Sequence, residues 1–149
     1  MLTEGVHQVL TVIYPLYKEE VYKRREQMMR LTALGSFGLI AMLFALLLSP
    51  QKHRLSSQET FLLGVVGVTW CGLFCALILQ QQYRHRLAKQ VLIQIEQALG
   101  FYEEGLIVEN QTLYPDSWRT AWLGDRSRRF YLSVLCLLTL LLLIALLLE

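Results

Sequence analysis

Three apolar runs without a charged residue dominate this chain: residues 31–48, 61–79 and 130–148. Each run is 18 or 19 residues long. At about 1.5 Å per residue, a helix of that length nearly crosses a hydrocarbon core roughly 30 Å thick. The sequence therefore predicts an all-α integral membrane protein with three transmembrane helices, the first two paired as a helical hairpin.

Lysine and arginine are unevenly divided among the segments outside these runs. Of the 14 such residues, twelve lie in 1–30 or 80–129 and two lie in the 49–60 loop. By the positive-inside rule, we expect the N-terminus and 80–129 in the cytoplasm, and the loop and C-terminus outside a plasma (inner) membrane. The arginines expected at the membrane interface are Arg24, Arg25, Arg30, Arg84, Arg86, Arg126, Arg128 and Arg129.

The segments that precede the first two spans carry helix signals. Residues 1–30 have the apolar spacing of an amphipathic helix, and Pro15 is expected to kink or restart it. A continuous helix is therefore expected from about residue 16 into the first span. Ser56 and Glu59 have the spacing of a capping box, which predicts the start of the second helix.

Small residues recur at helical spacing in the first two spans. Such residues let helices approach closely. The positions expected to pack are Gly35, Gly38, Ala41, Ala45, Gly64, Gly67, Cys71, Gly72, Cys75 and Ala76. Their partner is either the other arm of the hairpin or another chain. The leucine-rich third span is expected to be a peripheral anchor.

The central segment, 80–129, is predicted to continue the second span as a helix to about residue 99, with one apolar face. Residues 106–108 and 112–114 are consistent with a short β-hairpin. Asp116 is expected to cap a short helix that carries Trp118 and Trp122, and this helix suits the headgroup region. We expect a small helical segment with a dense supply of aromatic side chains.

Few residues are arranged for chemistry. The histidines, His7, His53 and His85, are scattered along the chain, and the cysteines lie inside the spans, where they are expected to act as packing residues. We therefore expect no metal and no cofactor. Phosphate-binding and nucleophile motifs are absent from the sequence, and the basic residues border the membrane, so neither a small-molecule substrate nor nucleic acid is predicted.

The leading hypothesis is a noncatalytic accessory, scaffold or assembly subunit whose partners are the bilayer and other subunits of a membrane complex, or further copies of itself. Aromatic residues beside charges often dominate interfaces. The predicted docking residues are Tyr102, Glu103, Glu104, Glu109, Tyr114, Trp118 and Trp122. One alternative is a homo-oligomeric membrane-perturbing or channel-like effector. Another is a small membrane-bound enzyme, with acid and base groups available only at Glu96, His85 and Glu103.

Overall fold

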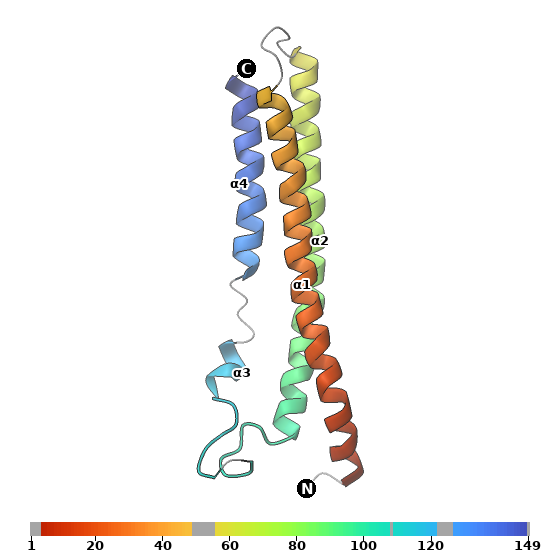
Figure 1. Cartoon of the computed structure of the whole chain (residues 1–149), viewed down its shortest axis with the longest axis vertical. Helices are drawn as coiled ribbons and strands as arrows, with labels where there is room; N and C mark the ends of the chain where they lie inside the picture. Colours follow the sequence, from red (N-terminus) through yellow and green to blue (C-terminus); the bar gives the residue numbers. More distant parts are fainter. Residues whose placement is uncertain (1–3, 49–55, 108, 122–126, 149) are drawn as a thin grey trace. The chain divides into compact units, whose positions relative to one another are not determined.

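The computed structural model describes residues 4–48, 56–107, 109–121 and 127–148. Its helices, in chain order, are α1 (Glu4–Leu48), α2 (Ser57–Ala98), α3 (Ser117–Ala121) and α4 (Ser127–Leu148) (Figure 1). The helices α1, α2 and α4 are long and apolar enough to cross a membrane. The all-helical prediction with three candidate spans is thereby confirmed.

The chain divides into two compact units. One, here called the polar unit, comprises Met1–Glu26 and Gln81–Arg126, and the other, the apolar unit, comprises Gln27–Gln80 and Ser127–Glu149. Both α1 and α2 continue without a break from one unit into the other. Each unit is therefore built from two parts of the chain that are distant in sequence.

Helix α1 begins earlier than expected, because it continues through Pro15 instead of restarting after it. Proline lacks the N–H that an α-helix needs, and its ring crowds the preceding turn. Packing compensates on both sides of this position. Tyr14, Tyr17 and Val21 lie in one apolar cluster with Ala88 and Leu92 of α2.

Helix α2 has a defined signal at each end. At its start the predicted capping box forms: the Ser56 N–H donates to Glu59 Oε2 at 2.8 Å, and the Glu59 N–H donates to Ser56 Oγ at 3.3 Å. At its end Gly100 has φ +76°, which glycine adopts without steric cost. The Gly100 N–H donates to the Gln97 carbonyl and the Phe101 N–H to the Glu96 carbonyl, a Schellman motif that closes the helix.

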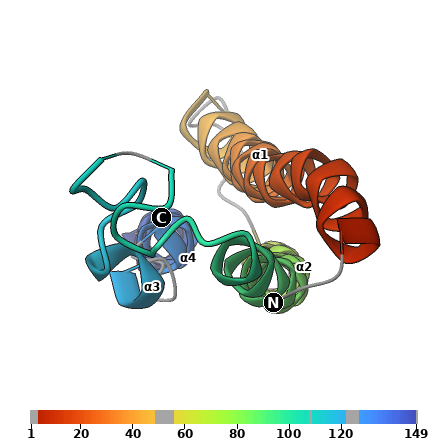
Figure 2. The ribbon, with the colours of Figure 1, turned by 90° about the horizontal axis from the view of Figure 1, so that it is seen from below.

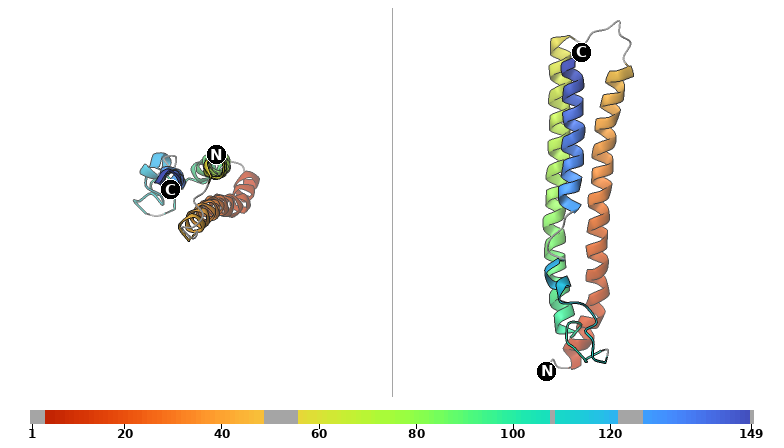
Figure 3. Two further views of the ribbon diagram at one scale, coloured as in Figure 1. Left: turned by 90° about the horizontal axis from the view of Figure 1, so that it is seen from above. Right: turned by 90° about the vertical axis from the view of Figure 1, so that its left-hand side faces the viewer.

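The apolar unit has a core drawn from α1, α2 and α4. Its buried side chains are Leu39, Leu46, Cys71, Ile78, Leu135, Leu142 and Leu146. The end-on view in Figure 3 separates the three helices, and its side view shows α4 beside α2. The contacts along α1 and α2 run in opposite order, as in an antiparallel pair, because Gly35 meets Phe74 and Gly38 meets Trp70.

The segment between α2 and α3 winds through turns (Figure 2), and its described residues form no strand. The expected β-hairpin is therefore not seen, although Asn110 has φ 57° and the Gly105 N–H donates to the Gln111 carbonyl at 3.4 Å. The pairing stops there because Tyr114 is held elsewhere: its N–H donates to the Phe101 carbonyl at 3.0 Å. Val108 lies outside the described residues.

Candidate functional site

A buried carboxyl group in the polar unit is hydrogen-bonded by tyrosines. Glu96 on α2 is 6% exposed, and its Oε2 accepts a hydrogen bond from the Tyr102 hydroxyl at 2.8 Å. The Tyr14 hydroxyl of α1 lies 3.5 Å from Glu96 Oε1 and 3.0 Å from the Tyr114 hydroxyl. Two tyrosines thus contact the carboxyl group directly, and Tyr114 joins the same network through Tyr14.

Aromatic rings pack against one another beside this hydrogen-bond network. The Phe101 ring makes edge contacts with Tyr14 at 5.4 Å and with Tyr114 at 5.6 Å between centroids, and Tyr114 packs against Trp118 at 5.2 Å. Such ring pairs are favourable beyond the area they bury. They hold the turn segment against α1, and the hydrogen bond from Tyr102 to Glu96 ties the same segment to α2.

Burial raises the pKa of the Glu96 carboxyl above its usual value of 4.5, while hydrogen bonds from Tyr102 and Tyr14 and the charge of Lys18 act in the opposite direction. A carboxyl group with a raised pKa in the folded state holds its proton there at pH values where the unfolded chain has lost it. Stability is therefore greatest below pH 4.5 for this group and falls as the pH rises through the folded pKa. Burial also raises the pKa of Tyr102 and of Tyr14, which keeps both hydroxyls protonated as donors.

Two cations lie over the rings of this cluster. The Arg119 guanidinium carbon lies 4.8 Å from the Tyr102 centroid, and Lys18 Nζ lies 5.6 Å from the Tyr14 centroid. Arg119 Nε also lies 3.7 Å from Asp116 Oδ1, one turn earlier. Each cation–π contact at such a surface stabilises by about 0.5–1 kcal/mol.

The predicted docking residues separate into two groups. Tyr102 is buried and Tyr114 is half-buried in the aromatic cluster, whereas Glu103, Glu104, Glu109 and Trp118 are exposed. Trp122 lies outside the described residues. Among the exposed residues nearby are three that the sequence analysis did not select, Leu106, Ile107 and Leu113, with exposed fractions of 61%, 49% and 40%.

Two of the three acid and base candidates of the enzyme hypothesis, His85 and Glu96, lie apart on α2. Glu96 is buried in the tyrosine cluster, His85 is buried three helical turns earlier on α2, and Glu103 is exposed. Eleven residues of helix separate the first two by roughly 16 Å along the axis. The burial of Gln82, His85 and Glu96 on one face was not predicted, although their spacing follows the apolar stripe at Ala88 and Leu92.

The predicted interface arginines are mostly at the surface. Arg24 pairs with Glu20 one turn earlier on α1 and donates to Gln81 Oε1 of α2 at 3.4 Å. Arg128 is half-buried, and the exposed ones are Arg25, Arg30, Arg84, Arg86 and Arg129. Arg126 lies outside the described residues.

Some of the small residues in the apolar unit meet a neighbouring helix. A methyl group on Gly35 would meet Phe74 and Leu135, one on Gly38 would meet Trp70, and one on Gly67 would meet Leu142 of α4. At Gly64 such a group would have ordinary contact distances of 3.6–3.9 Å to α4. The exposed positions are Ala41, Ala45, Gly72 and Ala76.

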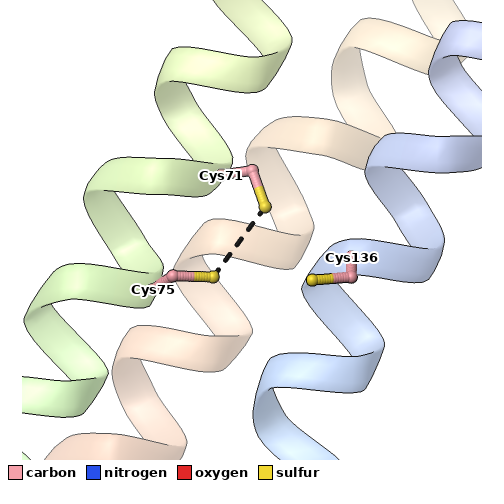
Figure 4. A group of neighbouring side chains, drawn as sticks. All are labelled: Cys71, Cys75 and Cys136. Atoms are coloured by element: carbon pink, nitrogen blue, oxygen red, sulfur yellow. Dashed lines mark hydrogen bonds between the residues drawn. The ribbon is translucent and has the colours of Figure 1, made fainter.

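The three cysteines also come together in the apolar unit. Cys71 and Cys75 lie one turn apart on α2 with their Sγ atoms 3.9 Å apart, and Cys136 of α4 points toward them (Figure 4). All three Sγ atoms lie within 4.8 Å of one another. These residues were predicted to act in packing. The i,i+4 spacing of Cys71 and Cys75 is visible in the sequence, but their distance to Cys136 is not.

No protein-family model, curated protein or solved structure matches this chain. The structural class of the protein is therefore inferred from its own helices. The described residues define an all-helical protein in which three helices have the length and composition to insert in a membrane.

Proposed function

We propose that the protein is inserted in the plasma (inner) membrane through α1, α2 and α4 and acts as a noncatalytic accessory, scaffold or assembly subunit. The N-terminus and residues 80–129 lie in the cytoplasm, and the C-terminus lies outside. The distribution of basic residues supports this orientation, with twelve on the proposed inner side and two in the 49–60 loop. Its cytoplasmic part docks another subunit of a membrane complex.

The observation that carries this proposal is the exposed surface of the turn segment, here called the acidic loop (residues 103–113). Leu106, Ile107 and Leu113 are exposed there beside the exposed carboxylates Glu103, Glu104 and Glu109. Large apolar side chains that gather on a surface are typical of interaction sites. The loop is held on the polar unit by the Tyr114 and Phe101 contacts, so it presents this surface without first having to order.

The charge of the loop indicates the kind of partner. A membrane surface with anionic lipids would repel three neighbouring glutamates, whereas a protein with basic residues around an apolar patch would attract them. Trp118, 40% exposed at the start of α3, extends the surface beyond the loop. The partner we propose is therefore a basic, partly apolar face of another subunit.

Charge reversal in the full-length protein tests the docking surface. The double variant Glu103→Lys with Glu104→Lys, and separately Trp118→Ala, are extracted from native membranes and weighed by native mass spectrometry. We expect both to lose a heterologous subunit that the wild type retains. Glu19→Lys is the matched control, because Glu19 is an exposed acid of the same unit outside the loop. Retention of the same subunit by all variants would contradict the proposal.

A second candidate, self-association, is favoured by a separate observation. Ala41 with Ala45 on α1, and Gly72 with Ala76 on α2, are pairs of small residues four positions apart, and all four are exposed in the structure. Pairs of this kind let a further helix approach closely in a membrane. A homo-oligomer in native mass spectra that Gly72→Leu dissociates, together with ion leakage from liposomes, would favour the channel-like or membrane-perturbing effector.

A further inference from the structure

We propose that Cys71, Cys75 and Cys136 form a binding site for a trivalent thiophilic metalloid, of which arsenic(III) is the example, held by three sulfur atoms. The site joins α2 to α4 within the apolar unit (Figure 4). It is separate from the tyrosine cluster and from the acidic loop, which belong to the polar unit.

The geometry of the thiols fits a three-coordinate ion. With the zinc–sulfur bond length of about 2.3 Å as a guide, three sulfurs around one centre lie at most about 4.0 Å apart. The Sγ atoms of Cys71 and Cys75 already lie 3.9 Å apart, and those of the whole group lie within 4.8 Å of one another. Closing the remaining gap requires a movement of about 1 Å or less, within the reach of a side-chain rotation.

The composition of the site selects soft ions. Among the described residues, no histidine, aspartate or glutamate joins the three thiols, and a set of thiols favours thiophilic centres over magnesium, calcium or manganese. The neighbouring core side chains, Ile78, Leu135 and Leu142, are apolar. Cys71 is buried and Cys75 half-buried, while Cys136 is exposed on α4, so a ligand has access from the Cys136 side.

Charge decides among the soft ions. Three thiolates leave a net charge of −2 with copper(I) and −1 with zinc(II), but zero with a trivalent centre. Residues 31–48, 61–79 and 130–148 contain no charged side chain to compensate a negative complex. Because an uncompensated charge in a membrane interior is costly, the neutral complex is favoured. This step depends on the membrane insertion proposed above, whereas the thiol geometry does not.

The binding reaction is balanced without a change of oxidation state. Arsenous acid, As(OH)₃, is neutral, and it reacts with three protein thiols to give As(S-Cys)₃ and three water molecules. Three As–O bonds and three S–H bonds break, three As–S bonds form, and each proton leaves on a hydroxide as water. A neutral ligand thus enters and a neutral complex results.

The test uses the full-length protein, reduced and reconstituted in lipid nanodiscs, with sodium arsenite as the probe. After desalting, bound arsenic is measured by elemental mass spectrometry, and thiols that still react with N-ethylmaleimide are counted by intact mass. We expect one arsenic per chain, all three thiols protected, and X-ray absorption with three sulfur neighbours and no oxygen. Cys136→Ser should weaken binding on the order of 100-fold, because the chelate loses its third ligand.

A matched control keeps the number of thiols constant. The double variant Cys136→Ser with Leu137→Cys moves one thiol to the next position of α4, which points about 100° away around the helix. Equal arsenic binding by this variant, or by Cys136→Ser alone, would overturn the three-sulfur site. Retention of copper(I) or zinc(II) but not arsenite by the wild type would overturn the charge argument. Alkaline carbonate extraction tests membrane insertion independently of arsenite binding. A protein that is not inserted in the membrane can therefore be distinguished from one whose three thiols do not form the site.

Discussion

Replacing Gly38 by alanine should destabilise the apolar unit, because the added methyl group would enter the indole ring of Trp70. A Cβ atom at this position would lie 2.6 Å from Trp70 Cζ2 and 2.7 Å from Cε2 and Nε1. The ring cannot bend away from the contact, and its N–H donates to the Gly35 carbonyl at 3.1 Å. Either α1 must move away from α2 or the indole must rotate and give up that hydrogen bond.

The expected cost follows from these contacts. Inserting a methyl group into a packed contact typically costs about 1–3 kcal/mol. Loss of the indole hydrogen bond would add about 1 kcal/mol, and the higher helix propensity of alanine offsets about 1 kcal/mol. We therefore expect Gly38→Ala to lower the free energy of unfolding by about 1–3 kcal/mol.

Gly72→Ala is the matched control on the neighbouring helix. A Cβ atom there meets nothing within 4 Å, so this variant gains helix propensity without a clash. Reversible unfolding of both variants and the wild type in mixed micelles of increasing sodium dodecyl sulfate, followed by tryptophan fluorescence, gives the three free energies. Equal stabilities of Gly38→Ala and Gly72→Ala would refute the reasoning. If it is right, Trp70→Phe should recover part of the loss in a double-mutant cycle.

Three further predictions concern other parts of the chain. Above pH 4.5 the melting temperature of the wild type should fall as the pH rises through the raised pKa of Glu96. Glu96→Gln should abolish this pH dependence, whereas Glu103→Gln, a change at an exposed residue, should leave it unchanged. A pH dependence that persists in Glu96→Gln would show that it comes from another group. Gly100→Ala should cost about 1–2 kcal/mol in thermal unfolding, because φ is +76° there and the added methyl group meets Leu106. Ser56→Ala should cost about 1 kcal/mol by loss of the capping box, and an unaltered melting temperature would contradict its role.

Local signals account for much of the helical structure. The absence of charge over 61–79 predicts a helix suited to lipid, Ser56 with Glu59 predicts its start, and the extension of α2 to Ala98 follows from the unbroken helical pattern after residue 79. Of the two outcomes expected at Pro15, a kink or a new helix start, the new start does not occur, because the contacts of Tyr14 and Tyr17 hold α1 together around this position.

The sites depended on contacts that local patterns do not contain. Tyr14 lies 82 residues from Glu96 and 100 residues from Tyr114 in the chain. The sequence indicated that Tyr114 belongs to an aromatic-rich segment but not that this segment folds back onto α1. Tyr102 and Tyr114 were predicted as docking residues, and the structure shows that they also make packing contacts within the polar unit.

By itself the sequence determined the three apolar helices and which segments carry the charged residues, because helix length and hydrophobicity are local properties of consecutive residues. Only the tertiary structure decided which faces of these helices meet. The rotation of one helix about its axis relative to another depends on side chains from both, and this rotation brings Cys136 to Cys71 and Cys75 and turns Gly67 toward Leu142 of α4. The same physical reason leaves Ala41, Ala45, Gly72 and Ala76 exposed, although their spacing resembles that of the residues that pack.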